Sequence, residues 1–137
     1  MEIITQTEKE TIGIAKEFAS QLESGEVLGL VGDLGAGKTC FTKGLAQGLR
    51  IKKNITSPTF VLMKVYPVKH KTIKNFVHID AYRLRSYNDL LAIGIEDYIS
   101  KDDSVVIIEW ADRIKDKKVK IKNIKFEIKN NFRIINI

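Results

Sequence analysis

The chain has 137 residues, of which 44% are hydrophobic and 29% are charged, and its formal net charge is +6. This composition excludes the disordered and collagen-like classes, and the length suits one domain, residues 1–137, with its own packed core. The sequence has no apolar run long enough to cross a bilayer, no signal peptide and only one cysteine. We therefore expect a cytoplasmic protein without a membrane partner, a disulfide or a cysteine-ligated zinc ion.

The first half of the chain shows a helix, a strand and a second helix. Thr7 and Glu10 have the spacing of a helix capping box, and apolar residues then recur every three or four positions, which predicts a helix over residues 8–23. A short apolar run at 27–31 predicts a buried strand, and the helix after it begins beyond a glycine-rich loop. The later elements are expected to be strands at 60–65, 75–80 and 105–108, with a helix over 87–99 that is broken at Gly94.

The last part of the chain carries the excess positive charge. Residues 1–114 contain 15 basic and 15 acidic residues, so the whole excess follows Ile114. This Lys-rich tail alternates apolar and charged side chains, which predicts one or two amphipathic strands. Its lysines either protect an exposed sheet edge against aggregation or bind tRNA or another acidic partner.

The glycine-rich loop, GDLGAGKT at residues 32–39, matches the phosphate-binding pattern of Gly, any four residues, Gly, Lys and Ser or Thr. Gly35 and Gly37 allow the backbone to turn successive N–H groups toward phosphates, and the helix that follows directs its positive end at the same anion. Lys38 is expected to reach the β- and γ-phosphates, and Thr39 is expected to bind Mg²⁺. The alternation of strands and helices around this loop predicts a three-layer α/β P-loop NTPase fold, with a mostly parallel central sheet and a C-terminal antiparallel strand region.

Two acidic residues follow predicted strands. Glu109 ends the aliphatic stretch of SVVIIEW, which is how the second NTPase motif looks when Glu replaces Asp, and it can bind Mg²⁺ or orient a nucleophile. Asp80, in HIDAYRL, has two interpretations. It either positions the attacking water and completes the Mg²⁺ site, or it pairs with Arg83 or caps the next helix.

Several neighbouring residues also have two interpretations. Arg83 either stabilises transition-state charge or forms a local salt bridge, and Cys40 is either a reactive thiol or a small buried residue. The segment SPTF at 57–60 is either a switch ordered by the γ-phosphate or an ordinary turn. His78 and Trp110 are predicted to be packing residues.

The absence of an NKxD motif disfavours a Ras-like GTPase and leaves ATP as the expected nucleotide. Only about 98 residues follow the phosphate loop, which leaves little room for the acceptor pocket and lid of a kinase. A small nucleoside or metabolite kinase and a nucleotide-dependent RNA-binding module remain the alternatives.

The segments GDLGAGKT, SPTF, HIDAYRL, IGIEDY and IIEW together resemble the TsaE (YjeE) family in order and spacing over about 80 residues. The resemblance implies a bacterial Mg²⁺-dependent ATPase whose low basal activity is stimulated by its partner proteins TsaB and TsaD. It would act as a conformational switch on their complex during threonylcarbamoyl modification of adenosine 37 in tRNAs reading ANN codons. Contact with tRNA would then be indirect, through the complex.

The resemblance also implies particular site residues. ATP or ADP would be bound by Thr7, Thr11, Gly32, Gly35, Ala36, Gly37, Lys38, Thr39, Cys40 and Asp112. Mg²⁺ would be held by Thr39 and Glu109. The residues acting in hydrolysis would be Lys38, Asp80 and Glu109.

Overall fold

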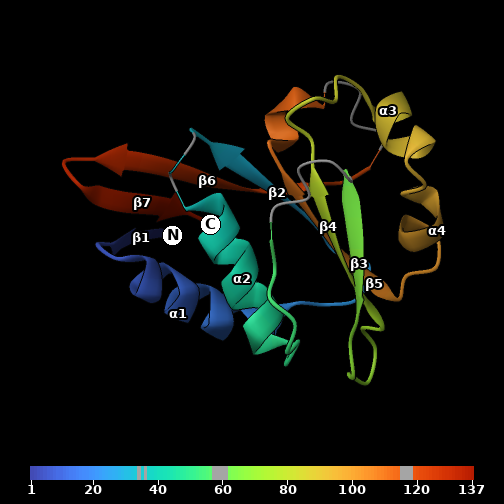
Figure 1. Cartoon of the computed structure of the whole chain (residues 1–137), viewed down its shortest axis with the longest axis horizontal. Helices are drawn as coiled ribbons and strands as arrows, with labels where there is room; N and C mark the ends of the chain where they lie inside the picture. Colours follow the sequence, from blue (N-terminus) through green and yellow to red (C-terminus); the bar gives the residue numbers. More distant parts are fainter. Residues whose placement is uncertain (34, 36, 57–61, 115–118) are drawn as a thin grey trace.

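One mixed sheet runs through the part of the chain that the structure describes. The computed structural model describes residues 1–33, 35, 37–56, 62–114 and 119–137 (Figure 1). The strands are β1 (Glu2–Thr5), β2 (Val27–Gly32), β3 (Met63–Pro67), β4 (Asn75–Asp80), β5 (Ser104–Glu109), β6 (Lys122–Lys129) and β7 (Phe132–Asn136). The helices are α1 (Glu8–Phe18), α2 (Lys38–Gly48), α3 (Tyr87–Ala92) and α4 (Glu96–Ile99), and 3-10 turns lie at Ala19–Gln21 and Ala111–Arg113.

The centre of the sheet is parallel and both sides are antiparallel. The strand order is β1-β7-β6-β2-β5-β4-β3, and the neighbours β6, β2, β5 and β4 run parallel to one another. The hairpin of β6 and β7, extended by β1, forms one antiparallel side, and β3 forms the other. The predicted α/β fold with a C-terminal antiparallel region is confirmed, and β3 adds a second antiparallel side that the sequence did not indicate.

Helices cover both faces of the parallel centre, which gives three layers (Figure 1). Strand β5 shows this best, because all of its residues are buried. Val105 and Ile107 pack into the core beneath α1 and α2, whereas Val106 and Ile108 pack into the core beneath α3, α4 and the second 3-10 turn. A strand buried on both faces needs apolar residues at every position, which explains the uninterrupted apolar run that marked it in the sequence.

Helix α1 begins as predicted and ends early. The Thr7 hydroxyl accepts a hydrogen bond from the Glu10 N–H at 3.1 Å, while the Glu10 carboxylate accepts one from the Gln6 N–H at 2.8 Å. The regular helix stops at Phe18 and continues as a 3-10 turn to Gln21, short of the predicted end at residue 23. The break predicted at Gly94 is confirmed, since α3 and α4 lie on either side of it.

Helices α1 and α2 approach each other closely. A β-carbon on Gly44 would lie 2.4 Å from the carbonyl oxygen of Ile12 and 2.5 Å from the β-carbon of Ala15, so only glycine allows this separation. The contact fixes α2 against α1. Because α2 starts directly after the phosphate loop, it also fixes the position of that loop.

The tail forms two strands, as predicted, but the edge-protection interpretation does not hold for Lys125, which has strand partners on both sides. Strand β6 lies between β2 and β7, and the sheet edges in the described ranges are β1 and β3. Ile124 and Phe126 face the core, while Lys125 and Lys129 are exposed on a strand that is paired on both sides. No helix within the described ranges combines the length and apolar character needed to cross a membrane.

Candidate nucleotide-binding site

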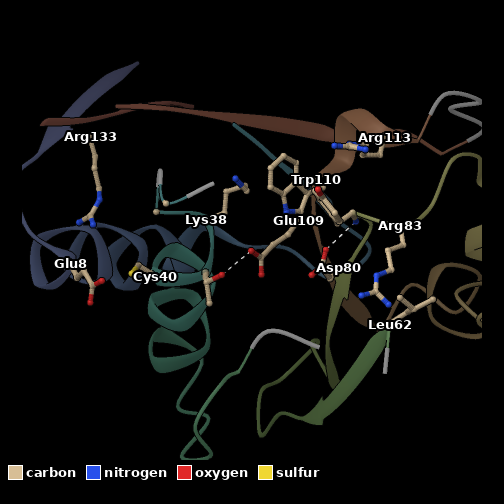
Figure 2. A pocket seen from close by; sticks show the side chains of 14 residues that line it. Glu8, Lys38, Cys40, Leu62, Asp80, Arg83, Glu109, Trp110, Arg113 and Arg133 are labelled. Atoms are coloured by element: carbon tan, nitrogen blue, oxygen red, sulfur yellow. Dashed lines mark hydrogen bonds between the residues drawn. The ribbon is translucent and has the colours of Figure 1, made fainter. Parts of the chain in front are cut away.

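A cavity of about 640 Å³ lies where the carboxyl ends of the parallel strands meet (Figure 2). This is the edge at which open α/β sheets bind ligands, and the volume suits a small organic ligand. The structure brings most of the predicted site residues together around it: Gly35, Gly37, Lys38, Thr39, Cys40, Asp80 and Glu109 all line the cavity. They come from the phosphate loop, α2, β4 and β5.

The phosphate loop ends in a residue that must be glycine. Gly37 caps the N-terminus of α2 with φ of +105°, a left-handed conformation that other residues rarely adopt. A β-carbon there would also lie 3.4 Å from the δ-carbon of Arg133. The first backbone N–H groups of α2 have no partners within the helix, so they are available to an anion in the cavity.

The Lys38 ammonium is held at the mouth of the loop. It donates hydrogen bonds to the carbonyl oxygens of Gly32 at 2.5 Å and Asp33 at 2.8 Å, and it lies 4.1 Å from the centroid of the Trp110 ring. Burial lowers the pKa of Lys38, and the negative charge of Glu109 opposes that effect. A bound phosphate would compete with the two carbonyls for the same ammonium.

Thr39 and Glu109 meet between α2 and β5. The Thr39 hydroxyl donates a hydrogen bond of 2.9 Å to Oε1 of Glu109, and the Glu109 side chain is almost fully buried. Asp80 lies beside Glu109 on the neighbouring strand, because the two residues are register partners of β4 and β5. Glu109 therefore directs one carboxylate oxygen at Thr39, and Asp80 is its nearest neighbour across the two strands.

This donor set fits Mg²⁺. Hydroxyl and carboxylate oxygens are hard ligands, and Mg²⁺ in nucleotide sites takes one or two of them together with phosphate oxygens and waters. Among the described residues no group of three or more His, Cys, Asp or Glu side chains gathers as a metal site. Two protein oxygens next to a phosphate-binding loop match the way this ion is shared with a nucleotide.

Asp80 closes a tight turn at the end of β4. Its Oδ1 accepts a hydrogen bond from the Tyr82 N–H at 3.0 Å, and its side chain faces the cavity (Figure 2). The interpretation of Asp80 as the cap of the next helix is wrong, because Ser86 and Asp89 form the capping box of α3. Arg83 also lines the cavity, and both interpretations of this residue stay open.

The surroundings of Cys40 favour the neutral form of its thiol. It is half-buried in the first turn of α2, and burial, with a smaller contribution from the charge of Glu8, raises its pKa. The cations Arg133 and Lys43 act in the opposite direction. The direction of the pKa favours the interpretation of Cys40 as a small packing residue over that of a reactive thiol.

Four described residues that the family resemblance implies are not among those that line the cavity: Thr7, Thr11, Gly32 and Asp112. Gly32 is the last residue of β2, and its carbonyl oxygen accepts a hydrogen bond from Lys38. Thr7 caps α1 with its hydroxyl, and the buried Thr11 hydroxyl lies 2.7 Å from that of Thr5. Asp112 is exposed on the second 3-10 turn, where its charge, like that of Glu109, opposes the lowering of the Lys38 pKa by burial. Ala36 and the segment 57–60 lie outside the described residues, and their predicted roles remain predictions.

The sequence did not single out several residues that line the cavity: Glu8, Leu62, Tyr82, Arg113 and Arg133. Of these residues, Arg133 could most readily have been predicted from the sequence. It lies two positions before the buried Ile135 of the same strand, and residues two apart in a strand face the same side of the sheet. At the opposite end of the cavity, the Tyr82 and Trp110 rings pack edge to face at 5.1 Å, and the Arg113 guanidinium lies 4.7 Å above Tyr82. Trp110 thus packs as predicted, yet its ring also forms part of the site.

A phosphate-binding loop between a parallel strand and a helix, at the carboxyl edge of a three-layer α/β sheet, places this chain in the class of P-loop NTPase folds. The family model described as threonylcarbamoyl adenosine biosynthesis protein TsaE matches residues 5–135. The chain belongs to the TsaE family.

Individual relatives agree with this assignment. The tRNA threonylcarbamoyladenosine biosynthesis protein TsaE of Treponema pallidum is 40% identical over 114 residues, which are 83% of this chain and 81% of the relative. The protein of the same name from Bacillus subtilis is 40% identical over 112 residues, 82% of this chain and 67% of that one. The crystal structure of Bacillus subtilis YdiB superposes with a TM-score of 0.71 and 31% identity, covering 98% of this chain and 82% of YdiB.

Proposed function

We propose that this chain is a Mg²⁺-dependent ATPase that takes part in threonylcarbamoyl modification of tRNA, at adenosine 37 of tRNAs reading ANN codons. Membership of the TsaE family and the names of the relatives support the process. One observation carries the ATPase assignment: the Thr39 hydroxyl and the Glu109 carboxylate meet at 2.9 Å beside Lys38 and the phosphate loop. This is the arrangement that nucleotide triphosphate hydrolysis uses in P-loop proteins.

The cavity suggests how the nucleotide would lie. Lys38, Asp80 and Glu109 mark the place of the β- and γ-phosphates, so the nucleoside would extend toward the end of the cavity formed by Glu8 and Arg133 (Figure 2). Lys38 would leave the carbonyls of Gly32 and Asp33 to contact the phosphates. The backbone N–H groups at the start of α2 would donate to the same oxygens.

Hydrolysis would use the acidic end of the site. Mg²⁺, held by Thr39 and Glu109, would neutralise charge on the phosphates. The Asp80 carboxylate, whose Oδ1 is oriented by the Tyr82 N–H, is placed to hold an attacking water as a hydrogen-bond acceptor. Arg83 and Arg113 line the cavity beyond Asp80. Their guanidinium groups would stabilise the negative charge that develops on the phosphates in the transition state.

The biological role would be conformational. We propose that ATP and its hydrolysis change the contacts of this chain with TsaB and TsaD, with the segment 57–60 as the part that responds to the γ-phosphate. A nucleotide can shift such a complex only by its different affinity for two states. A low basal turnover that rises in the presence of the partners is the expected signature.

The decisive experiment measures Mg²⁺-dependent ATP turnover by the purified chain, alone and with TsaB and TsaD. We expect slow turnover that the partners accelerate, loss of ATP binding in Lys38→Ala, and retained binding with slower hydrolysis in Asp80→Asn. No turnover under any condition, together with phosphate transfer to a small acceptor, would instead establish the kinase alternative. A steep salt-dependent affinity of the isolated chain for tRNA, without turnover, would establish the RNA-binding alternative.

A further inference from the structure

His78 lies beneath the proposed Mg²⁺ site and contacts its carboxylate. The side chain is fully buried on β4, and its Nε2 contacts Oε2 of Glu109, while Oε1 of Glu109 accepts the hydrogen bond from Thr39. His78, Glu109 and Thr39 therefore form one chain of contacts that joins β4, β5 and α2. Each of the two oxygens of Glu109 has a different partner in this chain.

The direction of the hydrogen bond follows from its chemistry. An ionised carboxylate can only accept, so the imidazole must donate through Nε2–H. Nδ1 of His78 has no hydrogen-bond partner among the described residues. With the proton on Nε2, Nδ1 carries only a lone pair, and no N–H group is left buried without an acceptor. His78 thus supplies one directed donor to Glu109.

From this geometry we propose that His78 is a positioning residue for Mg²⁺ binding, an inference that rests on the proposed ATPase function. Its Nε2–H holds Oε2 of Glu109 and keeps Oε1 directed at Thr39. Groups that hydrogen-bond to a metal-binding carboxylate fix its orientation, and their loss typically lowers metal affinity by about 10–100-fold. A residue that only filled space would leave this affinity unchanged.

The test compares three substitutions of His78, which distinguish the effect of its Nε2–H donor from the effect of its side-chain volume. In His78→Gln the amide nitrogen can reach the position of Nε2, whereas in His78→Asn it falls near the position of Nδ1. His78→Leu keeps apolar volume without a donor. Substitution of the other histidine, the exposed His70→Asn in the loop before β4, is the matched control. The affinity for a non-hydrolysable ATP analogue is measured by calorimetry with Mg²⁺ and with EDTA, together with thermal unfolding.

We expect Mg²⁺ to tighten analogue binding in the wild-type chain, in His70→Asn and in His78→Gln. In His78→Asn and His78→Leu, the ratio of the two affinities should fall by about 10-fold, with the affinity in EDTA unchanged. An unchanged ratio in Asn and Leu, or an equal loss in Gln and Asn, would overturn the proposal. Should the Leu variant fail to fold, the Gln and Asn pair decides. If Mg²⁺ does not change the affinity of the wild-type chain for the analogue, the proposed function itself is contradicted. If Mg²⁺ tightens binding equally in the wild-type chain and in all the His78 variants, only this inference is contradicted.

Discussion

The ammonium group of Lys38 has partners within the protein itself. It contacts the carbonyl oxygens of Gly32 and Asp33 and faces the ring of Trp110. These contacts compensate for the partial removal of the ammonium from water, because burial of a charge without hydrogen-bond partners costs free energy. We expect bound phosphates to replace part of these contacts, so that the net gain in affinity is smaller than the phosphate contacts alone would supply.

This exchange should be visible in the fluorescence of Trp110, the only tryptophan of the chain. We expect a bound non-hydrolysable ATP analogue to draw the Lys38 ammonium away from the ring and so to produce a saturable change in emission. In Lys38→Ala, which we expect to lose ATP binding, the saturable change should be absent. A change of equal size in that variant would contradict the exchange.

The residues of the site were predictable to different degrees. Lys38, Thr39 and Glu109 were identified because a phosphate loop fixes its ligands by local spacing, and a buried strand marks the acid at its end. Arg133 was missed because the local pattern shows which side of a strand a residue faces but not which other elements lie on that side. The role of Cys40 was open in the sequence, since thiol pKa depends on burial and on nearby charge.

At the scale of elements, replacing two glycines in neighbouring helices by alanine should change the free energy of unfolding in opposite directions. In Gly44→Ala the added β-carbon meets the backbone of Ile12 at 2.4 Å, so we expect a loss of about 1–3 kcal/mol in the free energy of unfolding. Gly13, in the exposed face of α1, has no atom within 4 Å of its added β-carbon. Gly13→Ala should therefore stabilise the chain by about 0.5–1 kcal/mol.

Urea unfolding of the two variants measures both effects. Because Gly44 also fixes α2 against α1, Gly44→Ala should weaken nucleotide binding as well, while Gly13→Ala should leave it unchanged. Equal stability of the two variants would show that α1 and α2 can separate without cost.

The elements themselves were predicted well where the signal is local. The α1 cap, the break at Gly94 and the fully apolar strand β5 were all found. Strand β1 was missed because it has four residues and its only pairing is with β7, at the other end of the sequence. Whether a segment forms a strand depends strongly on the strands that pair with it and only weakly on its own amino-acid sequence. The position of β6 inside the sheet was missed for the same reason.

At the scale of the whole molecule, charge is distributed unevenly. Strands β2, β4 and β5 and the helices come from the part of the sequence that carries equal numbers of acids and bases, whereas β6 and β7 carry much of the excess positive charge. The exposed side chains of Lys125 and Lys129 are available to an acidic partner, while the backbone of β6 pairs with β2 over Lys122–Phe126 and with β7 over Lys125–Lys129. Any attraction at this surface would thus act through side chains and weaken as salt is added.

The double burial of β5 has a consequence for hydrogen exchange. Its amides bond to parallel strands on both sides and lie under helices on both faces, so we expect them to exchange only through global unfolding. Amides of the peripheral strands β1 and β3 should exchange much faster through local openings, which mass spectrometry of deuterated peptides would resolve. Glu109 is the last residue of β5, so we expect its carboxylate to keep its place beside Thr39 during local openings of β1 and β3.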